Sequence, residues 1–457
     1  MLRVYLDWNV WNNLKRKSSQ FDELRIIMEN RDNLFLIPYS PAHIGDLTHG
    51  YSKKDRHEHI NSDLKYISEL SENLLLAKYS NQEIYFSKTN PEIIFDYISE
   101  QESKLSKLHY ELKNVEIYKD LIFPIPINGI DNRLYDYITS DGYLTMENIL
   151  MKTMEYIISL ISTEEYKYLR NDFQESIGVN KDKIFNSPNP LYEIDKILKD
   201  KGISFSQLIT ESLTAIKEKS ESNFIDEIIT YYVGLDLIGY NQDEIKVSQK
   251  KSKTFHNTID DANHVGYASV CDIFIVDDKR CKEKALYVYS ELNINTKVFS
   301  SSEFVEYWNK VLTLDSLNNQ LFKITSIANN FEPNIQEYFE NYNLQGYLSQ
   351  LYFFGYFNYI SWFENIKNYH ILRKVKPTNG NILLYDEFKH LTFHLIKYFG
   401  NDIHNKSVVT EDENFLKNLD EDDFILYRTW KVSNIGEIRL VVQKNHLSLY
   451  IDFRNTL

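Results

Sequence analysis

Acidic side chains in this chain fall where apolar stretches end or where a following helix is expected. Four of them are candidate metal ligands and catalytic groups: Asp7, Asp46, Asp261 and Asp278. Carboxylates gathered in one cleft repel one another, and proteins commonly offset this with a divalent cation that takes oxygen ligands. Mg²⁺ or Mn²⁺ suits such a site better than zinc. The sequence therefore predicts a metal site if the fold brings these residues together.

An alternating pattern of strands and helices supplies the elements that must position the carboxylates. Residues 1–60 alternate strand, helix, strand and helix, and the pattern resumes over residues 251–310. Such alternation predicts a parallel sheet. The carboxyl ends of its strands and the amino ends of the following helices lie on one edge, where ligands bind. We expect the four aspartates in one cleft there, with Asp260 and Asp261 opening a helix and Ser40 capping another.

The same segments, in order along the chain, resemble the PIN-domain nucleases. The resemblance rests on YLDWNV with Asp7 and Asn9, IPYSPAHIGDL with Asp46, DDANHVGYA with Asp261, and FIVDDKR with Asp278. It covers about residues 1–60 and 251–300. It implies a PIN-like, Rossmann-type three-layer α/β domain that hydrolyses phosphodiester bonds with Mg²⁺ or Mn²⁺, usually in RNA and sometimes in DNA.

The resemblance also implies a role for each matched residue. Asp7, Asp261 and Asp278 would hold one or two ions, Asp46 would bind metal directly or through water, and Asn9 would fix the loop or the Asp7 carboxylate. Two neighbours support the site and either could replace the chosen ligand: Asp260 and Asp277. His264, one turn after Asp261, is either a packed helix residue or a water or phosphate contact.

Departures from the family pattern keep two other functions open. Trp8 replaces a small hydroxyl residue and Val276 replaces a threonine, so the hydrogen bonds of those hydroxyls are absent or replaced. A non-catalytic PIN-like scaffold or partner-binding protein is therefore the alternative. A haloacid-dehalogenase-like phosphatase is disfavoured because Asn9 stands where that family has an acidic proton donor, and an amide cannot donate and recover a proton.

Basic residues flank the acidic positions although the net charge is −15. The segment KVSQKKSK, from Lys246 to Lys253, precedes the third acidic element, and KRCKEK follows the fourth. The predicted contacts to substrate phosphates are Lys250, Lys251, Lys253, Lys279 and Arg280. Such contacts would position a nucleic acid without reading its sequence. A solvated loop and an ordinary helix face are the alternative interpretation.

Periodicity divides the rest of the chain into two further parts. Residues 61–250 are mostly helical in pattern, with DLKYISELSENLLLAKYS as one helix, and we interpret them as an insertion or lid. From about residue 320, helices precede three antiparallel strands of a C-terminal α+β domain, at 320–457. The aromatic run 347–363 is interpreted as buried core in preference to a base-stacking surface. Either part offers a surface for a protein partner or an oligomer.

The location of the protein is expected to be the cytoplasm. The chain has no window of about 18 uninterrupted apolar residues and no N-terminal signal pattern. Its two cysteines, Cys271 and Cys281, suit a reducing compartment. By analogy with other nucleases that carry additional segments, a toxin or phage-defence role is a further expectation.

Overall fold

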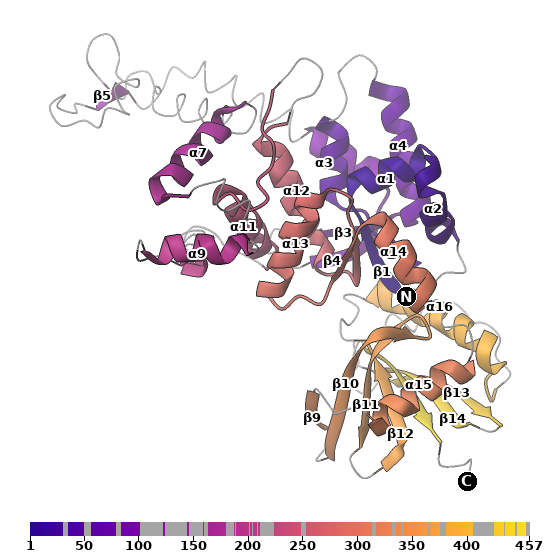
Figure 1. Ribbon diagram of the computed structural model, residues 1–457. Helices are drawn as coiled ribbons and strands as arrows, with labels where there is room; N and C mark the ends of the chain where they lie inside the picture. The colour runs from indigo at the N-terminus through magenta and orange to yellow at the C-terminus, as the bar shows by residue number, and fades with distance from the viewer. Residues whose placement is uncertain are drawn as a thin grey trace.

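The structure is a computed structural model with an α/β part and a β-rich part (Figure 1). It describes residues 1–30, 35–49, 56–78, 84–100, 122–123, 144–145, 159, 163–179, 187, 189–200, 202, 204–207, 209–210, 224–247, 253–312, 317–330, 335–339, 342–363, 366–374, 381–404, 425–433, 435–443 and 446–453. Among the helices it describes, none is long and apolar enough to cross a membrane.

A four-stranded parallel sheet lies at the centre of the α/β part. Its order is β2 (Phe35–Leu36), β1 (Leu2–Leu6), β7 (Ile273–Ile275) and β8 (Lys297–Phe299). All five residues of β1 are buried, as expected for a central strand with helices on both faces. The predicted parallel sheet is confirmed.

Helices cover both faces of this sheet. One face packs against α1 (Trp8–Lys15), α2 (Asp22–Glu29), α4 (Arg56–Ser71) and α14 (Ser301–Tyr307). The opposite face packs against α11 (Phe224–Leu237), α12 (Phe255–Ala268) and α13 (Lys279–Glu291). Because strand side chains alternate, Leu6 points to the first face and Tyr5 to the second. Asp7 comes two residues after Tyr5, so the same alternation places it on the second face.

The described helices of the predicted insertion share a core with the sheet. Buried residues of α9 (Pro190–Asp200) and α11 belong to the same cluster as those of α12 and α13. Here α7 (Glu165–Ile177) also lies beside α11. The segment ENILMKTMEYIISLIS lies almost wholly outside the described residues.

One predicted helix of the 61–250 region is wrong in its second half. The helix α4 ends at Ser71, and Leu74–Lys78 form strand β3, paired antiparallel with β4 (Ile84–Lys88). The backbone of Glu72 and Asn73 adopts left-handed φ angles of 52° and 61°, which ends the helix. The leucines that follow are buried in sequence, a pattern that suits a covered strand.

The C-terminal part is a seven-stranded antiparallel sheet that packs against two helices. The sheet order is β13 (Ile425–Val432), β14 (Gly436–Gln443), β15 (His446–Asp452), β12 (Ile366–Arg373), β11 (Phe357–Phe363), β10 (Tyr342–Phe353) and β9 (Ile335–Phe339). The helices are α15 (Leu317–Asn330) and α16 (Asn381–Phe399). The three antiparallel strands predicted at the C-terminal end are confirmed.

Helix was the wrong expectation for residues 335–373, which form β9 to β12. Tyr, Phe and Ile are frequent there and favour strands. Phe354 and Gly355 both have positive φ, 52° and 67°, and join β10 to β11 in a tight hairpin. Most of the aromatic run is buried, which agrees with its interpretation as core.

A buried ion cluster joins the two parts of the molecule. The Asp272 carboxylate, directly before β7, lies 2.7 Å from Lys374 Nζ and 3.6 Å from Arg3 Nε, and it accepts the Arg3 backbone N–H at 2.8 Å. Lys374 follows β12 and also donates to the Met1 carbonyl at 2.8 Å. Glu387 of α16 lies 3.9 Å from the same ammonium. Charges from both parts therefore neutralise one another at the junction.

Candidate acidic site

Asp7 stands at the carboxyl edge of the sheet, where β1 becomes α1. Its backbone N–H donates to the Ile275 carbonyl at 2.9 Å, which continues the β1–β7 pairing by one residue. Its side chain caps α1 and accepts the Asn9 backbone N–H at 3.2 Å. Only 2% of Asp7 is exposed. The Asn9 backbone thus supports the Asp7 carboxylate, and a side-chain hydrogen bond of Asn9 also lowers the pKa of Asp7.

Asp46 reaches the same place from α3 (Pro41–His49), which packs against α12. Its Oδ2 atom lies 2.7 Å from His264 Nε2 of α12. The His264 side chain is buried, and the Asp46 carboxylate is 19% exposed. His264 is therefore a packed helix residue, as one of the two interpretations has it, and it is also the buried partner of a site carboxylate.

Asp260 and Asp261 lie in the second turn of α12 and do not open the helix as predicted. The helix begins at Phe255, and Thr254 with Asn257 forms a capping box at its start. A Thr-x-x-Asn pattern is a weaker signal of a helix start than Ser/Thr-x-x-Glu, so this cap could not be recognised from the sequence. The earlier start places Asp260 one turn before His264 on one helix face.

Burial and neighbouring carboxylates raise the pKa values of Asp7, Asp260 and Asp261. Burial and then the Asp46 charge raise the pKa of Asp7 to about 6, against the opposing effects of His264 and Asn9. Burial and Asp46 also raise the pKa of Asp260 to about 8, and His264 opposes the shift. The pKa of Asp261 lies well above its ordinary value because of burial, then Asp243 and Asp7. The four carboxyl groups therefore share one poorly compensated region.

Asp277 and Asp278 follow β7 at the same edge but are committed to other contacts. Asp278 caps α13: its Oδ1 accepts the backbone N–H groups of Arg280 at 2.8 Å and Cys281 at 3.1 Å. Asp277 accepts the backbone N–H and hydroxyl of Ser301 at 2.8 and 2.7 Å. Both side chains are exposed, and neither is among the strongest electrostatic neighbours of Asp7 or Asp261. The structure thus gathers Asp7, Asp46, Asp260 and Asp261, and it gives Asp278 a capping role.

The donor set suits a hard divalent cation in chemistry but is not assembled around one. Carboxylate oxygens are the ligands that Mg²⁺ and Mn²⁺ prefer. Within the described part of the chain, no three His, Cys, Asp or Glu side chains are arranged closely enough to hold a metal ion.

A buried hydrogen-bond network behind Asp46 was not predicted. The Tyr5 hydroxyl lies 2.9 Å from His264 Nδ1 and 2.6 Å from Ser40 Oγ. The Ser40 backbone N–H donates to His43 Nδ1 at 2.9 Å, and His43 Nε2 lies 2.7 Å from the Leu6 carbonyl. A two-residue period could have indicated Tyr5, since it shares a strand face with Asp7. The network fixes the orientation of His264 and hence of Asp46.

A second buried ion network adjoins Asp261, and it includes one of the predicted basic residues. Lys284 is buried and lies 2.9 Å from Asp243 and 3.4 Å from Asp236. Arg170 of α7 binds Asp236 at 2.8 Å. Lys284 belongs to a basic segment that was expected to form an exposed rim, but its side chain is fully buried. Helical periodicity alone could not show that a lysine faces inward.

The five predicted phosphate contacts have different surroundings. Lys250 and Lys251 lie outside the described residues. Lys253 pairs with Glu244 at 3.5 Å, whereas Lys279 and Arg280 are exposed at the start of α13. Exposure at this helix start leaves Lys279 and Arg280 accessible to a ligand.

Comparisons with models of known protein families, with characterised proteins and with solved structures yield no match to this chain. The resemblance to PIN-domain nucleases therefore stays a prediction from the sequence motifs.

Proposed function

We propose that this protein is a Mg²⁺- or Mn²⁺-dependent endoribonuclease of PIN-like type that acts in the cytoplasm. The observation that supports the proposal is the convergence of four carboxylates from three distant segments at the carboxyl edge of a parallel sheet. Ligand sites of α/β proteins lie at this edge. Structural carboxylates are normally paired with cations or hydrogen-bond donors, whereas here burial and the charge of Asp46 raise the pKa values of Asp7, Asp260 and Asp261.

Each residue has a distinct part in the proposed reaction. Asp7, Asp46 and Asp261 would hold the cation, and Asn9 keeps the Asp7 carboxylate oriented through its backbone N–H. When bound, the cation would activate a water molecule and offset charge on the phosphoryl group. His264, held by Tyr5, would orient the Asp46 carboxylate. Asp260 would carry a proton near neutral pH in the cation-free protein, since its pKa is about 8.

The test combines cleavage with cation binding by the full chain. Fluorescent single-stranded RNA and DNA would be incubated with the wild type in Mg²⁺, Mn²⁺ or EDTA. We expect cation-dependent cleavage of RNA and a higher Tm in Mn²⁺, because a ligand stabilises the state that binds it. Asp7→Asn and Asp261→Asn should each reduce cleavage by at least roughly a hundredfold and shrink the Mn²⁺-induced rise in Tm.

Asp172→Asn is the matched control, because Asp172 is an exposed carboxylate on α7 with no proposed role. It should leave cleavage and the Mn²⁺ effect unchanged. Cation binding without cleavage of either nucleic acid would favour the non-catalytic scaffold. A wild type that neither cleaves nor responds to Mn²⁺ would contradict the proposal.

A further inference from the structure

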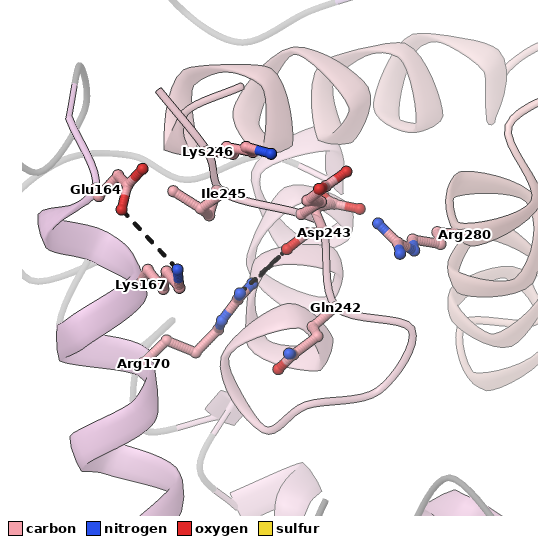
Figure 2. Close-up of a pocket in the computed structure, with 9 residues that line it drawn as sticks. Glu164, Lys167, Arg170, Gln242, Asp243, Ile245, Lys246 and Arg280 are labelled. Atoms are coloured by element: carbon pink, nitrogen blue, oxygen red, sulfur yellow. Dashed lines mark hydrogen bonds and ion pairs between the residues drawn. The ribbon is translucent and has the colours of Figure 1, made fainter. Parts of the chain in front are cut away.

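A pocket of about 520 Å³ lies beside the acidic site, between α7, the segment after α11 and the start of α13 (Figure 2). Its lining residues are Glu164, Lys167, Arg170, Gln242, Asp243, Glu244, Ile245, Lys246 and Arg280. Asp243 lines the pocket and is also the strongest electrostatic neighbour of Asp261. Asp243 therefore adjoins both the pocket and the acidic site.

The acidic residues of the pocket each have a cationic partner. Asp243 lies 2.9 Å from Lys284, which is buried behind the pocket. Glu244 lies 3.5 Å from Lys253 at the pocket edge. Glu164 lies 3.9 Å from Lys167 and accepts the Val247 backbone N–H at 3.0 Å. The negative charges of the pocket are thus already compensated.

Two of the four cationic side chains that line the pocket are paired with a carboxylate, and the other two are not paired within the described residues. Arg170 binds Asp236, and Lys167 binds Glu164. Within the described residues, no hydrogen bond or ion pair holds the side chain of Lys246 or Arg280. Figure 2 shows Arg280 entering from α13 and pointing toward the Asp243 segment, opposite Arg170. The pocket therefore has an excess of positive charge that an anion would neutralise.

We propose that this pocket binds one phosphodiester group and its nucleotide in a single-stranded nucleic acid that continues to the acidic site. The inference rests on the proposed function, since the strand is the substrate of that site. A guanidinium offers a planar pair of donors that matches phosphate oxygens, and an ammonium adds a point charge. The volume falls within the range of small-ligand pockets and suits one nucleotide, whereas a duplex would not fit.

Asp243 is held in place by its contacts, so the pocket would also position a bound strand relative to the acidic site. Its backbone carbonyl accepts two bonds from Arg170, both at 3.1 Å, and its carboxylate accepts from Lys284. These contacts hold the wall between the pocket and Asp261 in one place. A strand gripped by Lys246 and Arg280 would therefore meet the acidic site at a fixed offset, which serves positioning and not the chemical step.

The test measures binding in EDTA, so that cleavage does not contribute. A fluorescent oligouridylate of about ten nucleotides is titrated with the wild type, with Lys246→Gln/Arg280→Gln, and with the charge-matched control Lys323→Gln/Lys431→Gln on the C-terminal part. We expect the pocket variant to bind roughly tenfold to a hundredfold more weakly, and its salt slope to fall by about 0.7, the value for one lost phosphate contact on a single strand.

An oligomer of the same length with a neutral methylphosphonate backbone identifies the recognised group. The wild type should bind it about as weakly as the pocket variant binds the charged strand. Equal affinities of the two double variants, equal wild-type affinities for the two backbones, or no binding by the wild type would each overturn the proposal.

The pocket and the acidic site fail separately in these assays. Pocket-dependent binding by a wild type that never cleaves would leave the pocket assignment standing and contradict the nuclease. Cation-dependent cleavage that Asp7→Asn abolishes, with no effect of the pocket variant on binding, would leave the nuclease standing and overturn the pocket.

Discussion

Two buried aspartates at opposite ends of the first strand region have opposite electrostatic environments. Asp7 follows β1, and Asp272 lies beside Arg3 at its start; 2% of the first and 3% of the second is exposed. Burial raises the pKa of both carboxyl groups. At Asp272, the charges of Lys374 and Arg3 outweigh burial and hold the pKa well below its ordinary value. At Asp7, burial and Asp46 leave the pKa at about 6.

The difference shows how a structural carboxylate can be told from a candidate ligand. The Asp272 cluster brings its own cations, so its charges stabilise the junction without any external partner. The acidic site offers His264 to Asp46 and Lys284 near Asp261, which together leave several carboxyl groups with raised pKa values. Compensation, and not burial, separates the two. Under the proposed function, a site of the second kind would be stabilised by a cation from solution.

The largest expected effect comes from removing the charge of Asp272. Asp272→Asn should lower the free energy of unfolding by about 3–5 kcal/mol, because it leaves the ammonium of Lys374 and the guanidinium of Arg3 buried without their main counter-charge. Asp7→Asn should leave the cation-free protein equally stable or more stable, since it relieves repulsion. Urea unfolding curves without divalent cations measure both changes. Equal destabilisation by the two substitutions would contradict the distinction between a charge-compensated Asp272 and an uncompensated Asp7.

An intermediate effect is expected in the pH dependence of stability. Without divalent cations, Asp260 and Asp7 have folded-state pKa values of about 8 and about 6, above their ordinary value of 3.8. At these two groups the folded protein therefore binds protons that the unfolded chain does not, so their contribution to the Tm should rise as the pH falls from about 8 toward 4. Asp272 has the opposite sign, so its contribution is lost as the pH falls below its ordinary pKa of 3.8.

Melting curves across this pH range check the two signs. Asp260→Asn should flatten the rise between neutral and mildly acidic pH, and Mn²⁺ should reverse it because the cation competes with protons for the carboxylates. A Tm–pH profile of Asp260→Asn that runs parallel to that of the wild type would contradict the assignment of the acidic site.

The smallest expected effect concerns Asp278, which the sequence motifs place among the ligands and the structure uses as a cap. Asp278→Ala should cost about 0.5–2 kcal/mol of stability, as for other N-cap losses, and leave cation-dependent cleavage within a few fold of the wild type. Thermal unfolding and the RNA assay measure these outcomes. Loss of both cleavage and the Mn²⁺ response would return Asp278 to the ligand set.

Local patterns predicted the part of the fold that depends on alternation. The parallel strands, the helices after Pro41 and Asp278, and the C-terminal meander follow from periodicity and caps. The hairpin at Leu74 and the strands around Tyr347 could not be predicted from periodicity, because runs of leucine or aromatic residues suit helices and strands alike. Tertiary burial decides between them.

The candidate site was predictable as far as the sheet edge and no further. Edge position brought Asp7, Asp46 and Asp261 to one place, whereas the inward turn of His264 and Lys284 depends on how α12 and α13 pack. Nothing in the sequence indicated that Asp243 influences the site. Its charge acts on Asp261 because the fold brings the two residues near each other. Capping and ligation ask for the same residue type, so Asp278 could not be assigned from the motif alone.

Alternate residues of β1 bind segments that lie far along the chain, and this bears on the order of folding. Arg3 and Asp272 are 269 residues apart, and Tyr5 and His264 are 259 residues apart. Contacts between such distant residues form slowly, because the entropy cost of closing a long loop comes before the contacts can stabilise the fold. We expect the amides of β1 to gain protection from hydrogen exchange in the last kinetic phase of refolding, and protection in the earliest phase would contradict this order. The strand β1 would thus be among the last parts of the fold to become native.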